Sequence, residues 1–185
     1  MLAMASLISG CSNKRAPTWY TYFQDLGTYS SPRMADLNQD GILDIIMGAG
    51  GKEDAASDSA VIAVDGANGK LLWQIAGVNQ YTGCALFKDI TDDGIPDVFI
   101  GGRWAQFSAI NGKDGSLTWS FVTNRTTQSG ADSGWFNFSS PQFVPDQDGD
   151  GIEDLIVANG GNSLAAASDT NRPAGKILVL SSAKW

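Results

Sequence analysis

A nine-residue acidic stretch occurs three times in the chain, and it constrains the fold more than any other feature. The three copies are residues 36–44, 89–97 and 146–154. In each copy, oxygen-bearing side chains stand at positions 1, 3, 5 and 9, glycine stands at position 6 and isoleucine at position 7. Alternate positions of a tightly turned loop converge, and glycine permits the sharp turn. This spacing therefore predicts a loop that binds Ca²⁺ through oxygen atoms.

The predicted ligands are the four side chains and the position-7 carbonyl of each copy. They are Asp36, Asn38, Asp40, Ile42 and Asp44; Asp89, Thr91, Asp93, Ile95 and Asp97; and Asp146, Asp148, Asp150, Ile152 and Asp154. The alternative is three acidic turns whose Asp and Gly residues merely suit turn chemistry. Turn preference does not explain oxygens at the same four positions three times, so we predict up to three structural Ca²⁺ ions. Thr91 departs from the usual Asp or Asn at position 3, and we expect the second site to be the weakest.

The residues after each copy predict a strand. A helical calcium motif would need Glu at position 12 and helices on both sides, but position 12 is Met47, Ile100 or Val157. Each copy runs instead into a short apolar segment rich in β-branched residues, which is typical of a β-strand. The segments are residues 44–48, 97–101 and 154–158. Each loop is therefore predicted to join two strands.

Hairpins complete a repeating unit of four strands. Residues 61–73 and 107–119 each show two alternating apolar strands around an Asp-Gly or Asn-Gly turn, with Trp on the returning strand, and a third hairpin begins at Ile177. Successive loops start 53 and 57 residues apart. Four strands at such a period are typical of a β-propeller blade. We predict an all-β fold of four-stranded antiparallel propeller blades, about three of them, across residues 18–185.

The number of blades bears on completeness. Trp19 stands 17 residues before Asp36, close to the 16 residues between Trp73 and Asp89, so residues 18–20 resemble the last strand of a blade that has no other strands. Three blades are fewer than the four to eight that close a ring. We expect a fragment of a larger propeller, with a self-sufficient three-blade arc as the alternative.

The loops and hairpins resemble known repeat families. The Asp-x-Asn-x-Asp-Gly-x-x-Asp run of residues 36–44, with the apolar strand and glycines after it, resembles the FG-GAP or VCBS-type repeats of integrin α-chain propellers and of many bacterial envelope proteins. The hairpins at 65–73 and 111–119 resemble the repeats of pyrroloquinoline-quinone-type propellers. The resemblance implies a non-catalytic binding or adhesion scaffold for a protein or polysaccharide. Some rhamnogalacturonan lyases are calcium-containing propellers with similar loops, so a calcium-dependent polysaccharide lyase is the alternative.

Charge and composition limit the classes of partner and of activity that the chain can have. The three loops hold 12 of the 20 acidic residues and none of the 12 basic ones, so the net charge of −8 is local to them. No basic stripe is present, which argues against a nucleic-acid partner. The chain has no histidine, the commonest general base. These features favour a binding protein over an enzyme.

The first residues resemble a bacterial lipoprotein signal. Residues 1–10 are uncharged and apolar, and Leu7-Ile8-Ser9-Gly10-Cys11 resembles a lipobox. The resemblance implies a signal peptide at 1–10, lipidation of Cys11, a linker at 11–17 and an outer-membrane-anchored lipoprotein that faces the periplasm or the surface. Its contact with the membrane would be through the lipid alone. The alternative is a disordered apolar N-terminus with a free thiol.

Aromatic residues outside the repeat pattern are candidate ligand contacts. They are Trp104, Trp135 and Phe136. Exposed aromatic residues of this kind stack on sugars or anchor protein partners, although they could instead cover the edge of a blade. Trp73 and Trp119 recur at one position of the unit, so we predict that they lie in the core.

Overall fold

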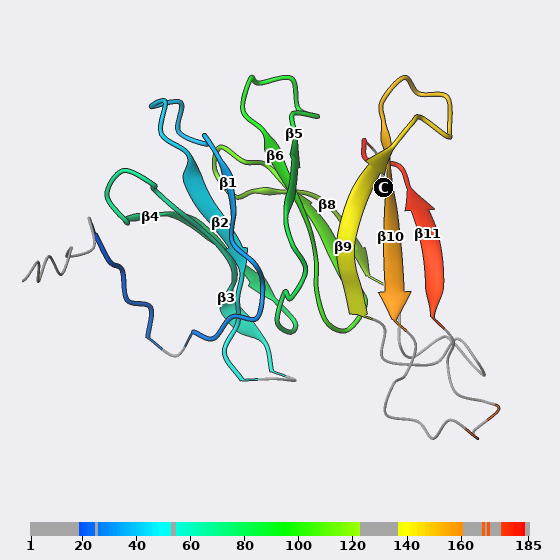
Figure 1. Ribbon diagram of the computed structural model, residues 1–185, viewed down its shortest axis with the longest axis horizontal. Coiled ribbons are helices and arrows are strands. Elements are labelled where there is room, and N and C mark those ends of the chain that lie inside the picture. Colours follow the sequence, from blue (N-terminus) through cyan, green and yellow to red (C-terminus); the bar gives the residue numbers. More distant parts are fainter. Residues whose placement is uncertain are drawn as a thin grey trace, which may run out of the picture.

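Three antiparallel sheets stand side by side in chain order (Figure 1). The computed structural model describes residues 19–24, 26–52, 55–122, 137–160, 168, 170 and 175–183. The first sheet contains β1 (Arg33–Ala35), β2 (Asp44–Gly48), β3 (Ser57–Val64) and β4 (Leu71–Gly77). The second contains β5 (Leu86–Lys88), β6 (Asp97–Gly101), β7 (Gln106–Ile110) and β8 (Leu117–Val122). The third contains β9 (Asn137–Val144), β10 (Asp154–Gly160) and β11 (Lys176–Leu180).

Within each sheet, every strand pairs with the next strand along the chain. This up-and-down order is that of a propeller blade, and it confirms the predicted all-β, four-stranded antiparallel units for the first two sheets. The third sheet has three strands among the described residues. None of the described residues forms a helix with the length and apolar character needed to cross a membrane.

The core consists of two apolar layers, one on each side of the middle sheet. Along β6, Val98 and Ile100 pack in the layer shared with the first sheet, whereas Phe99 packs in the layer shared with the third. Because both faces of the middle sheet are covered, every residue of β6 and β7 is buried. In the first sheet, β2 alternates between buried and half-buried residues. In β3 of the first sheet, Ala60–Val64 are also buried without a break, whereas in the middle sheet burial extends over the whole of both β6 and β7.

Tryptophan residues tie each unit to the next. The indole N–H of Trp73 donates a hydrogen bond of 2.7 Å to the carbonyl of Gly112, in the hairpin of the second sheet. Trp119 donates in the same way to Ser182, at 2.9 Å. Both side chains are buried, as predicted. Trp19 donates to the carbonyl of Gly66 at 2.9 Å, although the described residues 19–24 form no strand. Trp19 therefore takes the place that the fourth strand of a preceding blade would occupy.

The strand before the second loop is shorter than its apolar sequence suggests. The run 81–87 reads as a strand, but β5 begins only at Leu86. The reason is that this segment passes from one sheet to the next. The N–H of Tyr81 donates to the carbonyl of Ala49, just after β2 of the first sheet, at 3.1 Å, and the N–H of Gly83 donates to the carbonyl of Gly101 in β6 of the second sheet at 2.9 Å. Cys84 lies within this crossing as a half-buried free thiol.

Candidate metal centre

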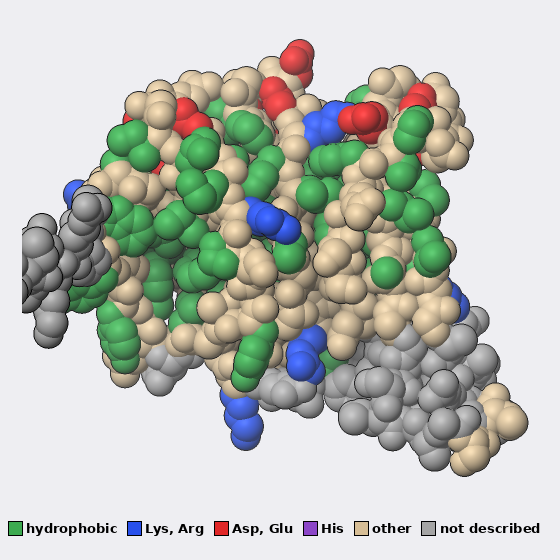
Figure 2. Space-filling model, in the orientation of Figure 1, with side chains coloured by type: hydrophobic (Ala, Val, Ile, Leu, Met, Phe, Trp, Pro, Cys, Tyr) green, Lys and Arg blue, Asp and Glu red, His purple; other side chains and the backbone are tan. Residues whose placement is uncertain are grey.

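The three acidic loops lie at one edge of the molecule. Each connects the first strand of a sheet to the second, and all three project from the top of the view in Figure 1. Acidic side chains gather along the same edge in Figure 2. Neighbouring units are linked there, because the side-chain amide of Gln39 donates to the carbonyl of Gly94 at 3.3 Å. Lys88 also forms an ion pair of 2.9 Å with Glu153 of the third loop.

The same hydrogen bonds form inside each loop. The position-1 aspartate accepts a bond from the backbone N–H of the position-6 glycine, at 3.0 Å in the first loop and 2.8 Å in the other two. The position-5 aspartate accepts from the N–H of the position-7 isoleucine, at 2.8 Å in the first loop and 2.9 Å in the others. The position-6 glycines have φ values of 83°, 81° and 87°, a conformation that glycine adopts without a Cβ clash. One backbone conformation therefore repeats three times, as the sequence pattern predicts.

In the first two loops the position-9 aspartate is a buried hydrogen-bond acceptor that joins the loop to the hairpin. One carboxylate oxygen of Asp44 accepts from the N–H of Leu37 at 2.8 Å, and the other accepts from the N–H of Gly66 at 3.0 Å. Asp97 repeats this pattern, with Gly112 at 3.2 Å. A Cβ on Gly66 or Gly112 would lie 2.0 Å from a backbone carbonyl oxygen, so these positions require glycine.

The third loop differs because serine replaces that glycine. Ser182 occupies the hairpin position of Gly66 and Gly112, and its hydroxyl donates to the carbonyl of Glu153 at 2.5 Å. One oxygen of Asp154 still accepts from the N–H of Gln147, at 2.6 Å. The other oxygen, Oδ1, is buried and has no hydrogen-bond partner, while the residue as a whole is 1% exposed. A buried carboxylate oxygen without a partner costs stability unless a cation or donor reaches it.

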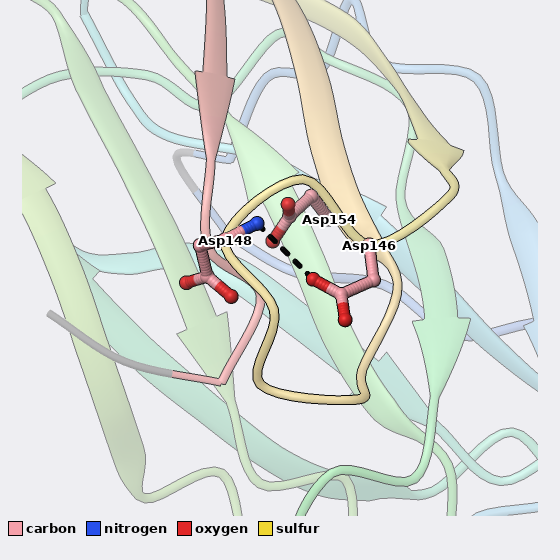
Figure 3. Close-up of side chains that lie close together, drawn as sticks. All are labelled: Asp146, Asp148 and Asp154. Atoms are coloured by element: carbon pink, nitrogen blue, oxygen red, sulfur yellow. Dashed lines mark hydrogen bonds between the residues drawn. The ribbon is translucent and has the colours of Figure 1, made fainter.

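Three carboxylates come together in the third loop. One oxygen from each of Asp146, Asp148 and Asp154 lies within 4.8 Å of the other two. Two oxygens that share a Ca²⁺ ion at 2.3–2.6 Å lie at most about 5 Å apart, so the cluster fits a calcium ion. Figure 3 shows the three side chains, with the backbone N–H of Asp148 donating to Asp146 at 3.1 Å.

Backbone donors keep one of these carboxylates ionised. The N–H groups of Gly151 and Gly149 hold the pKa of Asp146 below its ordinary value. Hydrogen bonds to the charged form favour that form, so Asp146 is an anion at neutral pH. An ionised carboxylate is the ligand that calcium requires.

The position-3 residue of the first loop is engaged as Asp148 is, whereas that of the second loop is not. The side-chain oxygen of Asn38 accepts from the N–H of Asp40 at 3.0 Å. The hydroxyl of Thr91 instead donates to Asp97 at 3.2 Å, which directs it to the position-9 carboxylate. The described residues show one group of three acidic side chains close enough to share a cation, and it lies in the third loop. Among the acidic residues that the structure describes, three predicted ligands thus come close enough to share a cation at residues 146–154.

The remaining predicted site residues are only partly described. Trp104 lies half-buried in the turn between β6 and β7, at the edge opposite the acidic loops. It and Ala105 have φ values of 61° and 53°, which non-glycine residues rarely adopt. Cys11, Trp135 and Phe136 lie outside the described residues, as does the predicted signal peptide.

A cavity between the first and second sheets is a further candidate. It has a volume of about 320 Å³ and is lined by uncharged side chains, which include Ile75, Val78, Tyr81, Gln106, Ser108 and Leu117. The hydroxyls of Tyr81 and Ser108 lie 2.6 Å apart in its wall. Burial raises the pKa of Tyr81, so its phenol stays neutral. The cavity offers hydrogen bonding and apolar contact but no charged group.

Two features of the site escaped the sequence reasoning. The bond from Gly66 to Asp44 joins residues 22 apart, and the bond from Gly112 to Asp97 joins residues 15 apart. Because these spacings differ between the two units, the sequence pattern did not reveal the bond between the hairpin glycine and the position-9 aspartate. An Asp-Gly or Asn-Gly pair does begin both hairpin turns. The exception at Ser182 was visible in the sequence, but its effect on Asp154 required the structure.

Comparison with known proteins supports the fold. A family model described as the FAM234A/B beta-propeller matches residues 19–164, which is more than half of the chain and includes all three loops. No curated protein and no solved structure matches the chain. The match confirms the β-propeller prediction, whereas the assignment to FG-GAP repeats stays a prediction.

Proposed function

The chain belongs to the FAM234A/B β-propeller family, and we propose that it is a calcium-stabilised propeller domain that acts as a non-catalytic binding scaffold. Its ligand would be a protein or a polysaccharide. The fold alone does not define a function, because propellers serve many. The proposal therefore depends on the chemistry of the acidic loops and of the edge opposite them.

The observation that carries the calcium proposal is the buried oxygen of Asp154. It has no hydrogen-bond partner, and it belongs to a carboxylate that lies beside those of Asp146 and Asp148. In the other two loops a hairpin N–H reaches the equivalent oxygen. In the third loop, Ca²⁺ would be held by Asp146, Asp148, Asp150, Asp154 and the carbonyl of Ile152. The ion would supply the missing charge partner and reduce the repulsion among carboxylates in the loop.

The proposed role of the metal is structural. The third loop joins β9 to β10, so a cation there would fix the geometry of these two strands. The first and second loops are proposed as further sites of lower affinity, because backbone N–H groups already occupy both oxygens of Asp44 and of Asp97. Binding in the range of about 10⁻⁴ to 10⁻³ M suits an extracellular module.

Isothermal titration calorimetry with matched variants tests the calcium site. We expect Asp154→Asn to remove the tightest binding equivalent. Glu153→Gln removes the same charge from the same loop, but its side chain pairs with Lys88 and lies outside the proposed ligand set. We expect this control to retain the site with an affinity within about threefold of the parent. Equal losses in both variants would show that net charge, and not coordination, governs binding, and no uptake by the parent would overturn the proposal.

The ligand-binding part of the proposal rests on the edge opposite the acidic loops. Trp104 is partly exposed there in a strained backbone conformation, and strained residues cluster at binding sites. We expect Trp104→Ala to weaken binding to envelope polysaccharide or protein at least tenfold, while Leu71→Ala, at an exposed residue at the start of β4, serves as the control. Release of unsaturated sugars from an acidic polysaccharide would overturn the non-catalytic assignment.

We also propose that the chain is anchored to the bacterial cell envelope through a lipid on Cys11. The lipobox-like residues 7–11 support this proposal. Mass spectrometry of the membrane fraction should find diacylglycerol on Cys11 and no residues before it. A Cys11→Ser chain should lose both the lipid and the membrane association, and an unmodified Cys11 in the parent would contradict the anchor.

A further inference from the structure

The cavity between the first and second sheets is lined by residues that take no part in the acidic loops. Its walls come from β4, the segment that follows β4, β7 and β8, and all of these lining residues belong to the described part of the chain. Both sheets have four strands. The volume of about 320 Å³ lies in the range of pockets that bind small molecules.

Close backbone contacts hold Tyr81 in the wall of this cavity. Its N–H donates to the carbonyl of Ala49 at 3.1 Å. A Cβ on Gly48 would lie 2.2 Å from the Tyr81 carbonyl oxygen, and a Cβ on Gly77 would lie 3.0 Å from the Tyr81 ring. Glycine at these two positions lets the neighbouring backbone pack directly against Tyr81. The phenol is therefore fixed in place by the fold.

The phenol forms a pair with a serine hydroxyl. The hydroxyl oxygens of Tyr81 and Ser108 lie 2.6 Å apart, and either can donate to the other. The pair carries two hydrogens, and the bond between the two oxygens uses one of them. Among the described residues neither hydroxyl has a second partner, although Tyr81 is 4% exposed and Ser108 is 2% exposed. One buried hydrogen therefore remains to be donated to an oxygen atom in the cavity.

The rest of the lining favours a neutral, largely apolar molecule. Val78 and Leu117 line the cavity and are about half exposed, at 51% and 55%. A ring packed against them would remove apolar surface from water. The lining contains no charged side chain, so a charged ligand would lose its hydration without gaining an ion pair. A cavity of about 150 Å³ holds a benzene ring, so this one has room for a ring with a substituent.

We propose that this cavity binds a neutral molecule with one ring and a carbonyl oxygen. The carbonyl accepts the remaining hydrogen of the Tyr81–Ser108 pair, and the ring packs against Val78 and Leu117. A carbonyl oxygen suits the pair because it accepts a hydrogen bond and needs no acceptor of its own. The site is separate from the acidic loops and from Trp104, so it does not depend on the function proposed above.

Fluorine NMR titration of the 185-residue chain tests the proposal with three probes of similar size. 4-Fluoroacetophenone carries the carbonyl, and we expect a Kd on the order of 1 mM. 4-Fluoroethylbenzene lacks the oxygen, and 4-fluorobenzoate replaces the ketone by an anionic group. We expect the benzoate to bind at least about tenfold more weakly than the ketone. Because the ketone and the hydrocarbon also differ in hydration, the informative quantity is the ratio of their Kd values, compared between variants.

Substitution of the hydroxyl pair tests the role of the remaining hydrogen. Tyr81→Phe or Ser108→Ala alone leaves one hydroxyl that can donate to the ketone, so the ratio should stay within about twofold of the parent. The double variant Tyr81→Phe/Ser108→Ala has neither hydroxyl, and its preference for the ketone should fall at least about threefold. The double variant replaces both partners by apolar groups of similar shape, so it should fold, and cooperative urea unfolding checks this.

A pair of tryptophan substitutions tests where the probe binds. Ser120→Trp fills the cavity from β8 and should weaken ketone binding at least about tenfold. Ser116→Trp makes the same change at an exposed position just before β8, outside the lining, and should leave the Kd within about twofold.

Any of four results overturns the proposal. The first is no binding of the ketone by the parent up to about 10 mM, which would mean that the cavity holds water only. The second is the same probe ratio in the parent and in the double variant. The third is an equal effect of the two tryptophan substitutions, and the fourth is binding of the benzoate as tight as that of the ketone.

Discussion

The loss of stability on removal of the position-9 carboxylate should depend strongly on calcium in the third loop and weakly in the second. Asp97 accepts bonds from the N–H groups of Ile90, Thr91 and Gly112, at 2.9, 3.1 and 3.2 Å. Asp97→Ala leaves all three donors without that acceptor. An orphaned buried donor costs about 1–3 kcal/mol, and two of the three are only partly buried, so the expected loss in the free energy of unfolding is about 3–5 kcal/mol in EDTA.

Asp154→Ala should behave differently because its carboxylate has one hydrogen-bond donor, Gln147, and one oxygen without a partner. In EDTA the substitution removes the hydrogen bond from Gln147, but it also removes a buried oxygen that has no partner. We therefore expect the free energy of unfolding to fall by only about 1–2 kcal/mol. At a calcium concentration of about 100 Kd the parent gains about 2.7 kcal/mol from its tightest site, and the variant does not. Calcium should therefore greatly increase the difference in unfolding free energy between the parent and Asp154→Ala, and it should change the difference between the parent and Asp97→Ala only a little.

Urea denaturation followed by tryptophan fluorescence measures the free energy of unfolding of the parent and of each variant, with one series in EDTA and one in excess calcium. We expect Asp97→Ala to be the more destabilising variant in EDTA, and we expect calcium to increase the loss of stability only for Asp154→Ala. A loss below about 1 kcal/mol for Asp97→Ala, or equal losses for both variants in EDTA, would refute the hydrogen-bond roles assigned to the two aspartates.

Three further predictions follow from single contacts. Trp119→Ala removes a buried ring and its bond to Ser182, and guanidinium denaturation should show a loss of about 3–5 kcal/mol, whereas a loss under about 1 kcal/mol would argue against the indole as a link between sheets. Ser182→Gly should let a hairpin N–H reach Asp154, so calorimetry should show weaker calcium binding, and unchanged affinity would contradict the explanation of the orphaned oxygen. Burial raises the pKa of Tyr81, so the folded state should lose stability as pH rises past about 10. Melting curves from pH 9 to 11.5 should show that Tyr81→Phe reduces this loss. Identical pH profiles for the parent and the variant would show that Tyr81 does not cause it.

Much of the fold could be predicted from sequence because its signals are local and repeated. The alternation around residues 61–64 and 107–110, and the loops that precede β2, β6 and β10, each specify their own strand. The tryptophans at 73 and 119 could be assigned to the core because they recur at one position of the unit. Such signals need no knowledge of distant contacts.

The features that could not be predicted depend on contacts between units. β5 is short because its leading residues bond to two sheets, and no local pattern encodes that division. The sequence shows the same acidic spacing in all three loops, yet Asp154 alone lacks the second donor that Asp44 and Asp97 have. That difference arises from Ser182, which is 28 residues away in the chain and belongs to a hairpin of different spacing.

A crystal structure with calcium, examined by anomalous scattering, measures the central claim most directly. We predict an anomalous peak in the loop 146–154, with Asp154 Oδ1 at about 2.3–2.6 Å from the ion. The peaks in the loops 36–44 and 89–97 should be weaker at the same calcium concentration. A third loop without a peak, while Asp154 Oδ1 is bonded to a protein donor, would contradict the account.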